Sequence, residues 1–117
     1  MRYLCLIYQD ADRPADLSEQ LRLICDERLA VDEELRARGQ LVASAVLQPA
    51  APATTVRARS GVLSLVDTPS ARQTAPLVAI YLLDARDLNE AIRLAGRLPL
   101  GRLGCVEVCP LEDSCPE

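Results

Sequence analysis

Three strand-length segments that are apolar on both alternating faces constrain the fold of this chain most strongly. They are residues 2–8 (RYLCLIY), 41–47 (LVASAVL) and 77–84 (LVAIYLLD). This pattern is typical of strands that are covered on both sides, because a strand with one wet face alternates apolar and polar residues. Only two helices are predicted, and they can cover only one face of a sheet. The second face therefore needs another cover, most simply the same sheet of a second copy, which predicts a homodimer with sheets packed face to face.

Two capping boxes mark where the predicted helices begin. Asp16 is followed three residues later by Glu19, and the helix that they open runs to about residue 38, with Gly39 as its stop signal. Asp87 and Glu90 repeat the spacing and open a shorter helix that ends before a Pro-x-Gly segment. Both helices are amphipathic, so each is expected to pack one side on the sheet.

The stretch 54–84 predicts three strands of that sheet, of which 77–84 is named above. Residues 54–59 alternate, Ser60-Gly61 supplies a two-residue hairpin turn, and residues 62–66 return alongside. The irregular segment 67–76 then connects to the strand 77–84. With a last strand at 105–109, the order is strand, helix, strand, hairpin, strand, helix, strand, which is an α+β pattern in a single domain over residues 1–117.

Charge and composition exclude several function classes. The net charge is -4 and the arginines are scattered, so the chain lacks the basic stripe that a nucleic-acid backbone requires. The six apolar or aromatic residues that follow Arg2 are too short a run for a signal h-region or a membrane span, and we expect a cytoplasmic protein without membrane contact. In that compartment the five cysteines are expected to be reduced thiols.

The cysteines are not expected to bind a metal. Cys105 and Cys109 share one face of a predicted strand but are separated by roughly 13 Å of rise, which is too far for joint ligation of one ion. Cys5, Cys25 and Cys105 are better explained as small buried residues. We expect neither a metal nor another cofactor.

Arg28 is out of place on the apolar side of the first helix. At about 100° per residue it projects near the middle of the stripe formed by Leu17, Ile24 and Leu35, where an unpaired charge would be costly. Its methylenes could pack while the guanidinium reaches solvent or an acidic partner. Alternatively, the guanidinium contacts a ligand, so Arg28 is a candidate ligand-binding residue.

Several segments of the chain resemble a known family. The opening RYLCLIY, the stretch EELRARGQLVASAVLQPAAPATTVRARSG and the closing AIYLLDARDLNEAIRLAGRLP with VEVCP are similar to the YCII-related family, in the branch named for its DGPFAETKE motif. The resemblance implies a ferredoxin-like α+β fold of the dimeric α/β-barrel type, with an antiparallel sheet and two helices on one face. It also implies a possible regulatory protein partner, because relatives are often associated with sigma factors.

The chain departs from that family where the family carries its chemistry. The segment DTPSARQTAP aligns with the motif and retains Asp67, Pro69 and Ala71, while most other signature positions differ. Many relatives place a histidine on the first helix, where this chain has Arg28, and the chain has no histidine at all. Arginine stays protonated and cannot act as an ordinary general base, so a His-Asp mechanism is excluded.

The remaining candidates are single polar side chains. Asp67 could be a catalytic base, although an Asp that opens a turn commonly makes local backbone hydrogen bonds. Tyr8 and Tyr81 could line a ligand pocket, or could bury their rings and bind local partners. Ser44 has no histidine to activate it as a nucleophile, and is kept as a ligand contact.

Two functions follow from these residues. The first is a non-catalytic or weakly catalytic dimeric domain that binds a small anionic ligand and acts as a regulatory or interaction module. The alternative is an enzyme that transfers a proton on a small organic acid or lactone, in the manner of a lyase or isomerase. In that enzyme Asp67 would be the base and Arg28 would hold the anion of the substrate.

Overall fold

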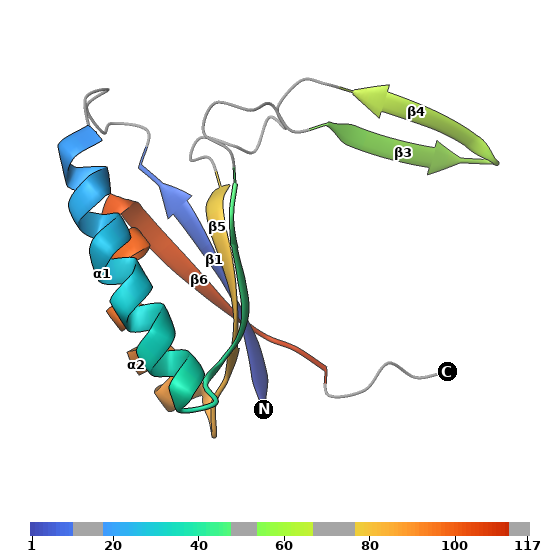
Figure 1. Cartoon of the computed structure of the whole chain (residues 1–117). Coiled ribbons are helices and arrows are strands. Elements are labelled where there is room, and N and C mark those ends of the chain that lie inside the picture. Colours follow the sequence, from blue (N-terminus) through green and yellow to red (C-terminus); the bar gives the residue numbers. More distant parts are fainter. Residues whose placement is uncertain (11–17, 48–53, 67–76, 113–117) are drawn as a thin grey trace.

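The computed structural model of this chain describes residues 1–10, 18–47, 54–66 and 77–112 (Figure 1). The elements follow one another in the order that the sequence predicts, with one short 3-10 helix added after the second α-helix. They are β1 (Arg2–Gln9), α1 (Ser18–Ala37), β2 (Leu41–Val46), β3 (Thr55–Arg59), β4 (Val62–Val66), β5 (Leu77–Asp84), α2 (Leu88–Arg97), η1 (Pro99–Leu103) and β6 (Gly104–Pro110).

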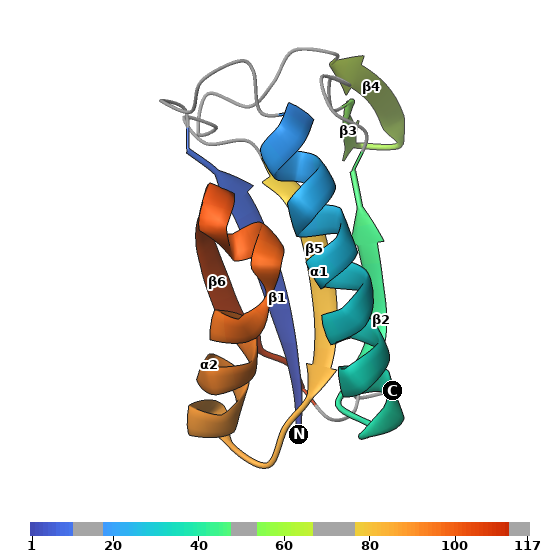
Figure 2. The ribbon, with the colours of Figure 1, turned by 60° about the vertical axis from the view of Figure 1, so that its left-hand side comes forward.

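Four strands form one antiparallel sheet in the order β2-β5-β1-β6. Helices α1 and α2 lie side by side on one face of it, as Figures 1 and 2 show from two directions. This confirms an α+β fold with an antiparallel sheet and two helices on one face. With the hairpin β3-β4 set aside, the strand and helix order is compatible with a ferredoxin-like fold.

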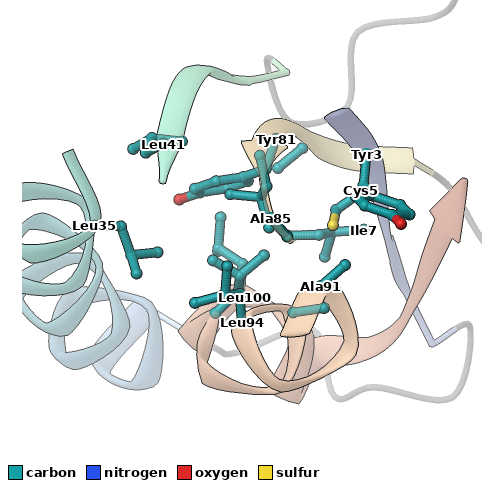
Figure 3. Packing of buried hydrophobic residues seen from close by; sticks show 14 of the residues in the cluster. Tyr3, Cys5, Ile7, Leu35, Leu41, Tyr81, Ala85, Ala91, Leu94 and Leu100 are labelled. Carbon is teal, nitrogen blue, oxygen red and sulfur yellow. The ribbon is translucent and has the colours of Figure 1, made fainter. Parts of the chain in front are cut away.

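The core fills the layer between the helices and the sheet. Alternate residues of the two central strands point into it, because successive side chains of a strand face opposite sides. Tyr81 and Cys5 lie among aliphatic side chains from both helices and from the segment around η1 (Figure 3). The core members on the sheet and helices include Tyr3, Cys5 and Ile7 of β1, Ala79, Tyr81 and Leu83 of β5, Ile24 and Leu35 of α1, and Ala91 and Leu94 of α2.

The opposite face of the sheet carries the other half of the alternation. Leu4 and Leu6 of β1 are paired with Leu82 and Ile80 of β5, and all four side chains are only half-buried. In the part of the chain that the structure describes, no helix lies over this face (Figure 1). We call it the open face, and its apolar character agrees with the pattern of the sequence.

The hairpin corrects one prediction. Strands β3 and β4 form a two-stranded sheet of their own that projects away from the main sheet (Figure 1). The prediction that the three strands of residues 54–84 share one sheet is therefore wrong. Both edges of β5 are occupied, by β1 and by β2, so the hairpin cannot pair with the strand that follows it in the sequence. The predicted turn is present, with positive φ at Ser60 (50°) and Gly61 (78°).

The helix signals can be compared where they lie among the described residues. Gly39 adopts a φ of 72° just past the end of α1, as its prediction as a stop signal requires. At α2, Oδ1 of Asp87 accepts a 2.9 Å hydrogen bond from the backbone N–H of Glu90, which confirms that cap. The predicted cap at Asp16 lies outside the described residues. Neither described α-helix has the length and apolar character needed to cross a membrane.

Candidate functional site

The phenol of Tyr81 and the carboxylate of Asp32 meet in the helix-sheet layer. Tyr81 Oη donates a 2.9 Å hydrogen bond to Asp32 Oδ1, from the centre of the sheet to helix α1. Tyr81 is fully buried, and Asp32 is 7% exposed. A buried carboxylate needs a polar partner, and here the phenol supplies it.

Arg28 lies one helical turn before Asp32, on the same side of α1. Its side chain is half-buried, and its Nε is buried without a hydrogen-bond partner among the described residues. Among the described residues, the acidic side chains of α1 that form ion pairs are Glu27 and Glu34. Arg28 and Asp32 form no ion pair within 4.0 Å. The Nε–H of Arg28 is therefore a hydrogen-bond donor that is free to bind a ligand and is shielded from water.

Burial and Asp32 together hold the proton on Tyr81. Burial has the largest effect in raising the pKa of the phenol, and the hydrogen bond and negative charge of Asp32 add to it. Arg28 acts in the opposite direction, through its charge and through hydrogen bonding. At neutral pH the phenol is a hydrogen-bond donor beside a cation.

Ser44 reaches the same side of the sheet. It is paired with Tyr81 in the register between β2 and β5, and residues directly opposite each other share a face. Its side chain is half-buried. We call Arg28, Asp32, Ser44 and Tyr81 the helix-side cluster.

Tyr8 lies on the other side of the sheet. It follows the buried Ile7 on β1 and is paired with Cys105 of β6, which places it on the open face. Its pKa is raised first by burial, then by the negative charge and hydrogen bonding of Glu107 and by the neighbouring thiols of Cys109 and Cys105. The structure therefore separates Tyr8 from Arg28, and the two do not contribute to one pocket on the same chain.

Asp67 lies outside the described residues, so its approach to Arg28 stays a prediction. The residue that the sequence analysis missed is Asp32. Its spacing of four residues from Arg28 was the available signal, because residues at i and i+4 are neighbours on a helix. Arg28 was expected to have an acidic partner or a ligand, and the acid of the helix-side cluster, Asp32, lies on the same helix.

The cysteines correct another expectation. Cys5 is buried, but Cys25 and Cys105 are exposed and Cys109 is half-buried. The expectation that Cys25 and Cys105 are buried is wrong. Cys25 is turned about 100° from the buried Ile24 on α1, and Cys105 belongs to the open face.

The fold and the helix-side cluster define a small α+β domain in which an arginine side chain and a buried phenol-carboxylate pair lie between helix and sheet. The family model of the YCII-related domain matches residues 1–114, and the chain belongs to this family. A search of curated proteins finds no match to the chain.

Proposed function

We propose that this protein is a small-ligand-binding YCII-related domain that holds an anionic group of its ligand at Arg28. The observation that carries the proposal is the buried Nε of Arg28, which lacks a partner among the described residues beside the Tyr81-Asp32 pair. A carboxylate oxygen would satisfy that donor, and arginine binds carboxylates with two parallel hydrogen bonds.

The protonation states of the cluster favour binding over catalysis. The raised pKa of Tyr81 keeps its phenol protonated at neutral pH, and a guanidinium cannot act as an ordinary general base. The chain has no histidine to exchange protons near neutral pH. A guanidinium and a protonated phenol are two hydrogen-bond donors that suit the binding of an anion, which supports a non-catalytic or weakly catalytic role.

The open face supports assembly of the domain as a homodimer of the dimeric α/β-barrel type. Leu4, Leu6, Ile80 and Leu82 present apolar surface there that no described helix covers. The projecting hairpin adds exposed apolar side chains, with Val56 57% and Leu63 66% exposed, and a lone two-stranded hairpin is only marginally stable in water. A second copy would bury both surfaces.

We also place the chain in the DGPFAETKE branch of the family. The support is the segment DTPSARQTAP, which retains the Asp, Pro and Ala of the motif. A regulatory protein partner, which that resemblance implies, stays a prediction.

A second candidate function has one observation in its favour. The buried carboxylate of Asp32 is a proton acceptor within the helix-side cluster, in addition to the predicted base Asp67. With Arg28 holding the substrate anion, these carboxylates would suit a lyase or isomerase that moves a proton on a small organic acid or lactone. The same ligand would then be turned over.

The test compares Arg28→Met with Arg36→Met. The first variant keeps an apolar stem and removes the guanidinium, and the second removes an exposed guanidinium from the same helix. Thermal shift is measured with small mono- and dicarboxylates. A ligand at 100 times its Kd stabilises the native protein by about 2.7 kcal/mol. We expect that gain in the wild type and in Arg36→Met, and its loss in Arg28→Met.

Two outcomes decide against the proposal. Unchanged ligand binding by Arg28→Met would show that the guanidinium does not hold the ligand. Turnover of a ligand by the wild type, abolished in Arg28→Met while light scattering shows an intact dimer, would replace the binding function by the enzymatic one.

A further inference from the structure

A second polar site lies between the two helices, near the C-terminal end of α1. A pocket of about 310 Å³ opens between the C-terminal end of α1 and helix α2, and its lining includes Arg38, Arg86, Arg93 and Arg97. None of the residues of the helix-side cluster lines it. The inference drawn from this pocket therefore stands apart from the proposed function.

The pocket carries surplus positive charge in a chain whose net charge is -4. Glu34 binds both Arg38, at 3.2 Å, and Arg97, at 2.5 Å, while Glu90 binds Arg86 at 2.7 Å. Four guanidinium groups thus face two carboxylates, which leaves two positive charges.

The guanidinium groups of the pocket are available to an incoming anion. Arg93 forms no ion pair with any residue that the structure describes. Arg38 and Arg86 are 62% and 75% exposed, and ion pairs that are this open to solvent are worth about 0–1 kcal/mol. A ligand oxygen can therefore replace a carboxylate partner at small cost.

Gln40 supplies an uncharged polar group at the same place. It lines the pocket, and its Oε1 is buried without a partner among the described residues. The residue is held in place by its backbone, since its N–H donates to the carbonyl of Leu35 at 2.9 Å and its carbonyl accepts from Asp84 N at 2.8 Å. Rotation of the amide by half a turn would present its NH₂ group to a bound anion and remove the unsatisfied acceptor.

We propose that this pocket binds the phosphate group of a small phosphate monoester. A phosphate monoester carries close to two negative charges at neutral pH, which matches the surplus of the pocket. Arginine forks bind phosphate oxygens in pairs. The volume is near the lower end of the range of small-molecule sites, about 300 Å³, so there is room for a short organic group on the phosphate.

The experiment is calorimetric titration of the full chain with glycerol phosphate and with inorganic phosphate, at about 20 mM salt, where ionic screening is weak. Arg93→Gln removes the unpaired guanidinium. Arg22→Gln is the matched control, because Arg22 is exposed on α1, does not line the pocket and carries the same charge. We expect Arg93→Gln to weaken the binding of glycerol phosphate at least tenfold and Arg22→Gln to change it less than twofold.

Gln40→Met gives a second, uncharged test. It removes the amide and keeps the length of the side chain, and we expect a severalfold weaker Kd for glycerol phosphate with an unchanged circular dichroism spectrum. Arg28→Met is expected to bind glycerol phosphate as the wild type does, which separates this pocket from the helix-side cluster.

Three results would overturn the proposal. Equal weakening by Arg93→Gln and Arg22→Gln would mean that only overall charge matters. If inorganic phosphate binds as tightly as glycerol phosphate, the pocket does not recognise the organic group, and a phosphate monoester is not its specific ligand. Loss of binding in Arg28→Met, with binding kept in Arg93→Gln, would move the site to the helix-side cluster.

Discussion

Tyr81 and Asp32, which are 49 positions apart in the sequence, are joined by a hydrogen bond in which the phenol at the centre of the sheet donates to the carboxylate on α1. The pair links the middle of the sheet to the helix that carries Arg28. Both groups are buried, so this hydrogen bond satisfies polar atoms that water does not reach.

Tyr81→Phe should therefore destabilise the fold. The substitution leaves the Asp32 carboxylate buried without its donor, which costs about 1–3 kcal/mol in the free energy of unfolding. Tyr3→Phe is the control, because Tyr3 is similarly buried but, among the described residues, its hydroxyl has only a weak hydrogen bond to the Met1 sulfur, at 3.9 Å. Urea denaturation measures both variants, and equal losses would contradict the role of the Tyr81-Asp32 bond.

Cys5 should make stability fall at high pH. Burial, with a smaller contribution from the charge of Cys109, raises the pKa of the Cys5 thiol from 9.0 to about 11. The folded state therefore holds the thiol proton more tightly than the unfolded state. This contribution, about 3 kcal/mol at most, is complete below pH 9 and is lost as the pH rises toward 11.

Cys5→Ala isolates this effect. All 13 basic residues of the chain are arginine, so no lysine titrates in the same window. Under reducing conditions, denaturation midpoints at pH 8 and pH 10.5 should differ less in Cys5→Ala than in the wild type. The same difference in both proteins would contradict the prediction.

Gly104 and Gly96 should respond oppositely to alanine. A Cβ on Gly104 would lie 2.1 Å from the carbonyl oxygen of Tyr8 and 2.8 Å from the N of Asp10, both backbone atoms that cannot move aside. A Cβ on Gly96, in α2, would meet nothing within 4 Å. We expect Gly104→Ala to lose about 2–4 kcal/mol of stability and Gly96→Ala to gain about 0.5–1 kcal/mol. Thermal denaturation checks both, and a stable Gly104→Ala variant would contradict the close approach of the two strands.

Ile80→Arg should dissociate the proposed homodimer. Ile80 lies on the open face, opposite Leu6, where an arginine would bring an unpaired charge into the sheet-to-sheet contact. Ile92→Arg is the control, since Ile92 is 52% exposed on α2. Light scattering at micromolar concentration should show a monomer only for Ile80→Arg. A wild-type monomer under these conditions would rule out the homodimer.

Local signals in the sequence were sufficient for most of the fold. The cap at Asp87, the stop at Gly39 and the turn at Ser60-Gly61 each depend on a few neighbouring residues, and each is present. The isolation of the hairpin β3-β4 was not predictable in this way. It depends on which strands pair with the two edges of β5, and strand pairing between distant segments is not visible in the local sequence.

The candidate site was predictable only in part, for a related reason. Because both faces of residues 2–8 are apolar, the alternation does not reveal which face meets the helices. Tyr8 and Tyr81 were therefore grouped although the sheet separates them. Burial of Asp32 depends on the rotation of α1 over the sheet, whereas the i, i+4 spacing from Arg28 was visible in the sequence.

The central position of β1 has a consequence for how the chain reaches this structure. Arg2 pairs with Asp84 of β5, and Tyr3 pairs with Pro110 of β6. Both edges of β1 therefore stay unpaired until β5 and β6 have been synthesised. During synthesis the ribosome must deliver nearly all of the described residues before this strand has both neighbours. Until then its two edges and apolar faces are open to other chains, which makes slow translation or truncation before β6 a route to aggregation.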